Sequence, residues 1–327
     1  MHGPNITTSA ARDSRVALVT CAPMNGLDSD DELTVAPLRE RGVRVEAAVW
    51  DDPDVDWTAY DLAVVRSTWD YYPRRDEFLA WARRVPRLAN PAAVLAWNTD
   101  KRYLRDLAAA GVAIAPTTWI EPGAAWTPAD AGEVVVKPAV SGGGIDTGRY
   151  DLADADERRL AVAHAARLSG DGRLVMVQPY LAAVDEHGET ALMFLGGRYS
   201  HTVRKGALLT GPDVVVEGLY RQEEITAREP APDQVAAAEA VLAAVPFDRD
   251  DLLYARVDLI PAGVASGCSV AESAVKRPRL ATGRAGAGAP LLLEIELTEP
   301  SLFLGTAPGA PERFADAVTA TLNRTAR

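Results

Sequence analysis

Two short acidic segments near the C-terminal end carry the residue types that bind a divalent metal. Arg256 and Asp258 lie two positions apart in LLYARVDLI, and Glu294 and Glu296 lie two apart in LLLEIELTEPSLF. Residues two apart on a strand share a face at roughly 6.5 Å, so an antiparallel pair of strands would bring the four side chains together. Three carboxylates beside one guanidinium are costly to bury without a further cation. Since Mg²⁺ prefers carboxylate oxygens and often holds substrate phosphates, the pattern predicts a magnesium–nucleotide site. For the two glutamates alone, a solvated outer sheet face is the alternative, but Arg256, Asp258 and the following Glu299-Pro300-Ser301 favour the metal site.

A lysine beside a glycine-rich loop is the second chemical feature. Lys137 ends the apolar run EVVVK, and the loop SGGG follows at residues 141–144. A lysine next to free backbone N–H groups suits phosphate binding. A solvent-exposed lysine at a strand end, followed by an ordinary turn, would give the same sequence pattern. The loop matches neither the Walker pattern nor G-x-G-x-x-G, which excludes a simple P-loop or dinucleotide-binding site.

Lys101 lies in the segment NTDK, where we expect a helix from Thr99 to Ala110 with Thr99 as its N-cap. A lysine in the first turn opposes the helix dipole, so a bound anion would account for it. Exposure on the surface accounts for it equally well.

Two further segments have polar groups in positions that could line a pocket. The run VMVQ continues into Pro179-Tyr180-Leu181, whose backbone could meet a flat ring while Asp185 meets ribose; a strand leaving the core is the alternative. Polar residues also crowd the expected hairpin around Gly196-Gly197. Of these, His201 has no nucleophile partner, which favours a structural or substrate-facing role over a catalytic one.

The elements that must position these residues begin with a small α/β domain. Strands at 15–20, 43–50 and 61–66 alternate with helices, which is typical of a parallel sheet whose ligands bind beyond the strand ends. The segment RSTWDYY follows the third strand there; its aromatic residues could wall a pocket or pack a domain boundary. We expect residues 1–14 to be a disordered leader and 263–290 to be an exposed, flexible insertion. Helices are also expected at 75–84, 155–168, 233–245 and 311–325, and strands at 133–137 and 173–178.

Composition limits the class of protein. The chain has 327 residues, 48% of them hydrophobic, and a formal net charge of −12, which argues against binding nucleic acid by counterion release. An ATP site would need local cations. Cys21 and Cys268 form no metal or disulfide pattern, and no apolar run is long enough for a signal peptide or a membrane span. We therefore expect a cytoplasmic protein that contacts no membrane.

Taken in order, seven segments of the chain resemble the ATP-grasp superfamily. The resemblance is closest to the glutathione synthetase and ribosomal-protein-modification ligase branch, which includes the D-cycloserine-forming cyclo-ligase. It extends from residue 61 to residue 305, most of the chain. The segments are RSTWDYY, NTDKRYL, VVVKP with SGGG, VQPYL, GETALMFLGGRYSHTVRK, YARVDL and LEIELTEPSLF.

The resemblance implies an α/β ATP-grasp fold that binds the nucleotide between two α+β subdomains. It implies a preliminary α/β domain at 15–98, a small lid subdomain at 99–182 and a C-terminal subdomain at 183–327. Mg²⁺ would be held by Asp258, Glu294 and Glu296; many relatives have Asn in place of the last, so a second Mg²⁺ is conceivable. The nucleotide would contact Lys101, Lys137, Ser141, Gly142, Gly143, Gly144, Gln178, Pro179, Tyr180, Leu181, Asp185 and Glu189. Arg256, Lys205 and Arg204 would act in catalysis. The substrate would face Arg66, Ser67, Trp69, Asp70, His201, Glu299 and Ser301.

The implied chemistry is ATP-dependent ligation of a small, amino-acid-like carboxylate to an amine. The carboxylate attacks the γ-phosphate to give an acylphosphate and ADP, and the amine then displaces phosphate. Alternatives are intramolecular closure of the D-cycloserine type, a phosphotransferase, and a nucleotide-binding regulatory protein. The cofactors would be ATP and Mg²⁺, and relatives suggest a homo-oligomer.

Overall fold

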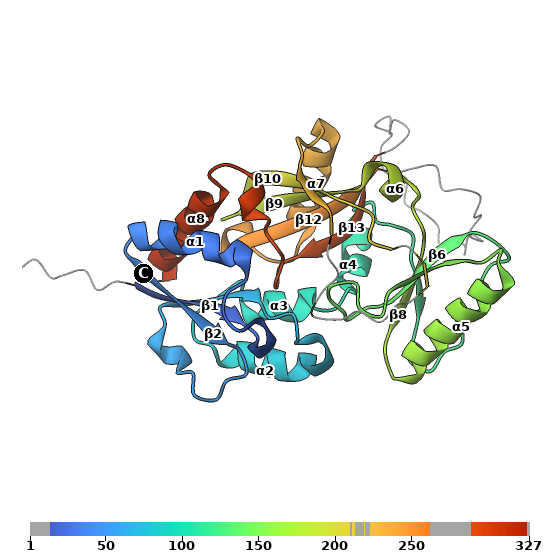
Figure 1. Ribbon diagram of the computed structural model, residues 1–327, viewed down its shortest axis with the longest axis horizontal. Coiled ribbons are helices and arrows are strands. Elements are labelled where there is room, and N and C mark those ends of the chain that lie inside the picture. Colours follow the sequence, from blue (N-terminus) through green and yellow to red (C-terminus); the bar gives the residue numbers. More distant parts are fainter. Residues whose placement is uncertain (1–13, 210, 213–218, 220–222, 262–288, 326–327) are drawn as a thin grey trace, which may run out of the picture.

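The computed structural model describes residues 14–209, 211–212, 219, 223–261 and 289–325, which form three sheets with flanking helices (Figure 1). Nearly all of the expected leader at 1–14 and of the expected insertion at 263–290 lies outside the described residues.

The first sheet is parallel, with the strand order β2-β1-β3-β4. Successive residues of β1 point to opposite faces. Val16 and Leu18 pack in a core with Leu38 of α1, whereas Ala17 and Val19 pack in a core with Phe78 of α2. Helices therefore cover both faces of the predicted parallel sheet. The elements are β1 (Ser14–Thr20), α1 (Ser29–Glu40), β2 (Val43–Val49), β3 (Leu62–Ser67), α2 (Arg75–Arg84), β4 (Leu88–Ala89) and α3 (Ala92–Asn98).

The second sheet is antiparallel, with the strand order β11-β10-β9-β12-β13. Strands β9 and β10 form the predicted hairpin, in which Gly196 and Gly197 both have positive φ (55° and 72°). Strands β12 and β13 pair in the predicted antiparallel sense. The elements are β9 (Glu189–Leu195), β10 (Arg198–Lys205), β11 (Ile225–Ala227), α7 (Pro232–Ala244), β12 (Tyr254–Ile260), β13 (Leu291–Glu296) and α8 (Ala310–Thr325).

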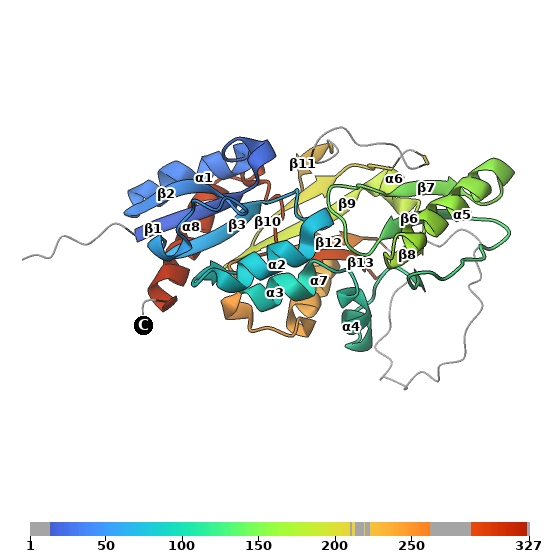
Figure 2. The same cartoon turned by 90° about the horizontal axis from the view of Figure 1, so that it is seen from below.

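The third sheet is also antiparallel, in the order β5-β8-β6-β7, and α5 packs on one of its faces (Figure 2). It projects away from the first sheet, at the opposite end of the molecule (Figure 1). Its elements are β5 (Thr118–Ile120), β6 (Glu133–Pro138), β7 (Gly148–Asp151), α5 (Ala155–Gly170) and β8 (Val175–Pro179), followed by the short helix α6 (Ala183–His187).

The expected helix from Thr99 to Ala110 is wrong at its start. Helix α3 ends at Asn98 with Thr99 as its C-cap, and α4 (Tyr103–Ala109) begins after a turn. The Asp100 side chain accepts a hydrogen bond from the backbone N–H of Arg102 at 3.0 Å, so Asp100 rather than Thr99 supports the new helix start. Lys101 consequently lies in the turn between the two helices.

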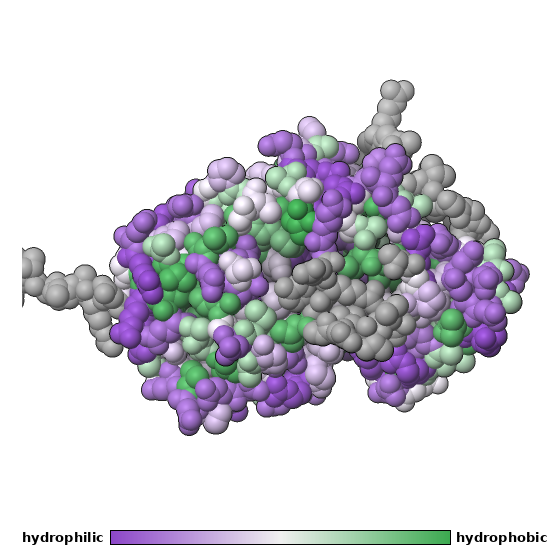
Figure 3. Space-filling view, in the orientation of Figure 1, coloured by the Kyte–Doolittle hydropathy of each residue, from purple (hydrophilic) through white to green (hydrophobic). Residues whose placement is uncertain are grey.

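The first two sheets share one hydrophobic core. Val64 of β3, Met193 of β9 and Phe314 of α8 belong to the same buried cluster, so the C-terminal helix joins the two layers. Helices α1 and α8 lie against each other in this region (Figure 1). On the visible face, apolar side chains form small patches among polar ones (Figure 3). Among the described residues, no helix has the length and apolar character needed to cross a bilayer.

Candidate active site

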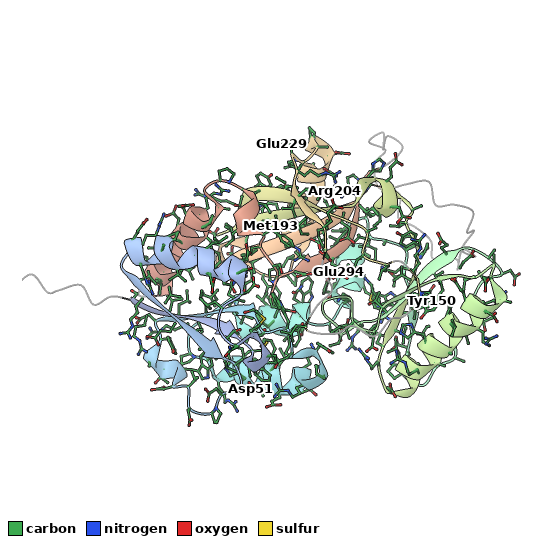
Figure 4. The ribbon with its side chains drawn as sticks, in the orientation of Figure 1. Asp51, Tyr150, Met193, Arg204, Glu229 and Glu294 are labelled. Carbon is green, nitrogen blue, oxygen red and sulfur yellow. The ribbon has the colours of Figure 1, made fainter. Side chains whose placement is uncertain are left out.

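A cavity of about 650 Å³ is lined by residues of the second and third sheets and of the segment that follows β3. Figure 4 places Glu294 near the middle of the molecule, where β13 approaches the third sheet. Most of the predicted site residues line this cavity: Trp69, Lys101, Lys137, Ser141, Gly142, Gly143, Gly144, Gln178, Pro179, Tyr180, Leu181, Glu189, Lys205, Arg256, Asp258, Glu294, Glu296, Glu299 and Ser301.

The register of β12 and β13 brings the four residues of the acidic segments together. Arg256 is directly opposite Glu296, and Asp258 is opposite Glu294. The Arg256 guanidinium donates through Nε and Nη2 to both oxygens of Asp258, each at 2.9 Å, and through Nη2 to Glu296. Arg256 and Asp258 are only 5% and 2% exposed. Burial acts to raise the pKa of Asp258, but the charges of Arg256 and Lys205 outweigh burial and hold that pKa below its usual value.

Glu294 forms ion pairs with the two lysines that were predicted to contact phosphates. Lys137 Nζ lies 2.9 Å from its carboxylate and Lys101 Nζ lies 3.7 Å away. Burial opposes ionisation, yet the two ammonium charges keep the pKa of Glu294 well below the normal range. Lys101 Nζ also donates to the carbonyl oxygen of Ser141 at 3.1 Å, which ties the glycine-rich loop to the same point.

Lys205 forms ion pairs with three carboxylates of the cavity. Its Nζ lies 3.1 Å from both Glu189 and Asp258, and 3.6 Å from Glu223. Burial alone would lower the pKa of this lysine, but the charges of Asp258 and Glu189 raise it well above the ordinary value. Lys205 is therefore a fixed positive charge beside the Arg256–Asp258 pair.

The carboxylates of β12 and β13 offer the hard oxygen donors that Mg²⁺ prefers. Within the described ranges, however, no group of three or more His, Cys, Asp or Glu side chains is arranged to hold an ion. Asp258, Glu294 and Glu296 instead contact lysine or arginine. The donor chemistry fits the predicted metal, and occupancy would require these side chains to exchange partners.

The segment after β8 forms one wall of the cavity. Gln178 is buried, and its side chain donates to Thr117 Oγ1 at 2.9 Å. The backbone N–H of Tyr180 donates to the carbonyl oxygen of Glu133 at 2.8 Å, which fixes the peptide that the sequence placed beside adenine. Asp185 is not part of the cavity lining; its carboxylate accepts from the Tyr180 hydroxyl, so the expected contact with ribose is not supported.

Arg66 does not face the cavity, contrary to the sequence-based expectation. It is 3% exposed, and its Nε donates to Asp31 of α1 at 2.6 Å. Its guanidinium lies over the rings of Tyr254 and Phe314, at 5.4 and 5.6 Å from their centroids. Arg66 therefore joins β3, α1 and α8, and its role is structural.

Four other predicted residues also lie outside the lining. Ser67 donates to Thr20 Oγ1 at 3.0 Å, and Asp70 accepts from Trp50 Nε1 at 2.9 Å. His201 is buried, with Nε2 at 2.8 Å from the carbonyl oxygen of Leu302. Arg204 Nε donates to the carbonyl oxygen of His187 at 3.1 Å, and Figure 4 places Arg204 toward the upper edge of the molecule, away from Glu294. Strand alternation explains Arg204, since its neighbour Lys205 takes the cavity face.

Sequence reasoning missed the side chains that hold the outer edge of β13. This strand ends its sheet, so its outward N–H and C=O groups have no neighbouring strand apart from an isolated bridge between Leu292 and Ile114. Asn98 donates to the carbonyl oxygen of Ile295 and accepts from the N–H of Leu297, both at 2.7 Å. The Tyr103 hydroxyl accepts from the N–H of Ile295 at 3.2 Å, and Asn90 donates to the carbonyl oxygen of Leu297 at 2.6 Å. The need of an edge strand for partners to its outward backbone N–H and C=O groups is the signal that could have identified these polar residues.

Comparisons with known proteins agree with this architecture. A family described as "D-cycloserine synthetase DcsG, N-terminal domain" matches residues 16–90. The cycloserine biosynthesis protein DcsG of Streptomyces lavendulae is 38% identical over 322 residues, 93% of this chain and 97% of that protein. The crystal structure of D-cycloserine synthetase DcsG matches with a TM-score of 0.74 and 34% identity over 94% of this chain and 100% of that one. A D-alanine–D-alanine ligase of Bacillus anthracis, complexed with ATP, matches with a TM-score of 0.56 and 16% identity over 95% and 98% of the two chains, which shows a shared fold.

The three-sheet fold and the cavity between its sheets define an ATP-grasp ligase. Within that class, the chain belongs to the D-cycloserine synthetase (DcsG) family. It is an ATP-dependent, amide-forming ligase, and the predicted superfamily, α/β fold class and enzyme class are confirmed.

Proposed function

We propose that this ligase activates the carboxylate of a small amino acid with ATP and closes it onto a nitrogen of the same molecule, as in D-cycloserine formation. The observation that carries this proposal is the 38% identity to DcsG over 93% of this chain and 97% of that protein. D-Cycloserine is a five-membered ring closed by an acyl–nitrogen bond, so its synthesis requires an activated carboxyl and an internal nucleophile.

The charge of the cavity lining supports the binding of ATP together with Mg²⁺. The described lining has four cationic side chains, Lys101, Lys137, Lys205 and Arg256, and six acidic ones, Glu189, Glu223, Asp258, Glu294, Glu296 and Glu299. Its formal charge is therefore −2, and these residues alone cannot neutralise a triphosphate. We propose that Asp258, Glu294 and Glu296 hold Mg²⁺, which when bound supplies positive charge at the phosphate oxygens. The two lysines at Glu294 would then contact phosphates under the Ser141–Gly144 loop, and Gln178 to Leu181 would border adenine.

The chemical step needs positioning and charge, not a protein nucleophile. A substrate carboxylate oxygen attacks the γ-phosphorus, the bond to the bridging oxygen of ADP breaks, and an acylphosphate forms. The internal nitrogen then attacks the acyl carbon, loses a proton, and phosphate leaves with the former carboxylate oxygen. Arg256 and Lys205 are fixed cations at the carboxylate strands, and we assign to Arg256 stabilisation of the negative charge on the transferring phosphoryl group and the tetrahedral intermediate.

The test uses the open-chain amino acid that results from hydrolysing the acyl–nitrogen bond of D-cycloserine, 3-aminooxy-D-alanine. With carboxylate oxygens labelled with ¹⁸O and Mg-ATP present, we expect ADP, phosphate and D-cycloserine in equal amounts, with one labelled oxygen in each phosphate. Ring formation without label in phosphate would reject the acylphosphate route. ADP release that requires a second, separate amine would replace cyclisation by intermolecular ligation.

Several narrower expectations stay predictions. They are the boundaries at residues 15–98, 99–182 and 183–327, a cytoplasmic location, and assembly into a homo-oligomer.

A further inference from the structure

One carboxylate of the cavity differs from the rest in its electrostatic surroundings. Five of the six acidic side chains in the described lining form an ion pair with Lys101, Lys137, Lys205 or Arg256. Among the described residues, Glu299 has no such pair. The four cations of the cavity pair with the other acids, so a ligand could supply the ion-pair partner of Glu299.

Glu299 is nevertheless held in place. Trp69 Nε1 donates to its backbone carbonyl oxygen at 3.1 Å. The Tyr71 hydroxyl hydrogen-bonds its carboxylate, and the Tyr71 ring, 4% exposed, is stacked on Phe78 with centroids 4.6 Å apart. A carboxylate with a fixed backbone and a fixed phenol partner is preorganised to receive a ligand group.

Burial, and then the charge of Glu296, raises the pKa of Glu299 to about 8, against the weaker lowering effects of Tyr71, Lys101 and Arg256. The charges of Lys101 and Arg256 thus lower the pKa of Glu299 too little to offset burial and the charge of Glu296. A group that supplies one positive charge and N–H donors would do so.

We propose that Glu299, positioned by Tyr71 and Trp69, binds the ammonium group of the amino-acid substrate. This inference rests on the proposed function, because it assumes an amino acid in this cavity. The aromatic residues Trp69, Tyr71, Tyr72 and Phe303 also line this cavity, and aromatic faces attract ammonium groups. The substrate would be oriented by opposite charges: its ammonium group at Glu299 and its reacting carboxylate toward Arg256.

The test compares two substrates that differ only in the ammonium group: 3-aminooxy-D-alanine and 3-(aminooxy)propanoic acid. A charge-assisted hydrogen bond is worth about 1.5–3 kcal/mol, so the wild-type enzyme should prefer the amino acid on the order of 10- to 100-fold in kcat/KM. In Glu299→Gln this preference should fall to near unity, while kcat/KM for the analogue without the amino group changes little. The matched control is Asp70→Asn, an equally isosteric change beside Trp69 but outside the cavity; it should keep the wild-type preference.

The outcomes separate this inference from the proposed function. An unchanged preference in Glu299→Gln, or an equal loss for both substrates, would overturn the role of Glu299 while leaving cyclisation intact. If the wild type converts neither substrate, cyclisation of this acid fails, and calorimetry with Mg-ADP still decides the role of Glu299. Wild type should then bind D-cycloserine more tightly than isoxazolidin-3-one, the same ring without the amino group, and Glu299→Gln should not discriminate. No difference between the two rings in wild type would overturn the inference.

Discussion

Replacing Asn98 should show how strongly the edge of β13 depends on a side chain from outside the sheet. Asn98→Ala removes the amide that joins the carbonyl oxygen of Ile295 to the N–H of Leu297, both at 2.7 Å. Asn98 is 8% exposed and its two partners are almost fully buried, so water has little access to the broken bonds. An unsatisfied buried group costs about 1–3 kcal/mol, so we expect a loss of about 3 kcal/mol in the free energy of unfolding. That corresponds to a decrease in Tm of roughly 5–10 °C.

The same substitution should also weaken Mg²⁺ binding at the proposed metal site, because Glu296 lies between the two residues whose backbone groups hydrogen-bond Asn98. We expect the Mg²⁺ concentration for half-maximal activity to rise severalfold, at temperatures where the variant is still folded. Calorimetry and a magnesium titration of ADP release measure the two effects. Asn323→Ala is the matched control, since Asn323 is exposed on α8. A variant at Asn98 with the wild-type Tm and magnesium dependence would refute the reasoning, because the edge would then be satisfied without the amide.

Three further outcomes follow from the ion pairs and pKa shifts. Lys137→Met should raise KM for ATP about 10- to 100-fold in steady-state kinetics, because a charge-assisted phosphate contact is lost; an unchanged KM would remove Lys137, now paired with Glu294, from the phosphate site. Arg66→Met should cost about 3–5 kcal/mol in chemical unfolding by leaving Asp31 buried and unpaired, and the double variant with Asp31→Leu should recover most of it; a single variant as stable as wild type would contradict this. The folded protein holds more protons on Glu299 than the unfolded chain between its ordinary pKa of 4.5 and about 8, so stability should fall as pH rises through that window. Thermal melts of the free enzyme should show a shallower decline for Glu299→Gln, and parallel curves would argue against the raised pKa.

Local patterns predicted those parts of the site that depend on one strand at a time. Glu294 and Glu296 share a face because strand residues alternate, and Lys137 reaches the same cavity because it lies at the end of an apolar strand. The pairing of β12 with β13 could also be predicted, since both apolar runs have charged residues two positions apart, and a one-residue slip would move one set to the other face.

Residues whose orientation depends on distant partners could not be placed in this way. Arg66 lies near the carboxyl end of the parallel strand β3, where ligands commonly bind, but its side chain is directed to α1, and its partner Asp31 is 35 positions earlier. Thr99 was a reasonable N-cap by composition, yet Asn98 is recruited by β13 and Asp100 supports the next helix instead. The contacts of Arg66 with Asp31 and of Asn98 with Ile295 join segments far apart in sequence, which local patterns do not reveal.

The arrangement of charges in the cavity links nucleotide and metal binding in the function that we propose. Lys101 and Lys137 neutralise Glu294, so a phosphate that draws both lysines away would leave that carboxylate enclosed and unpaired. The cost of such a charge is several kcal/mol, which ATP alone would have to offset from its own contacts. A divalent ion that takes over the carboxylates removes this cost, and the lysines become free for phosphate in the same exchange. The two ligands should therefore bind cooperatively, because each compensates the charge that the other leaves unpaired.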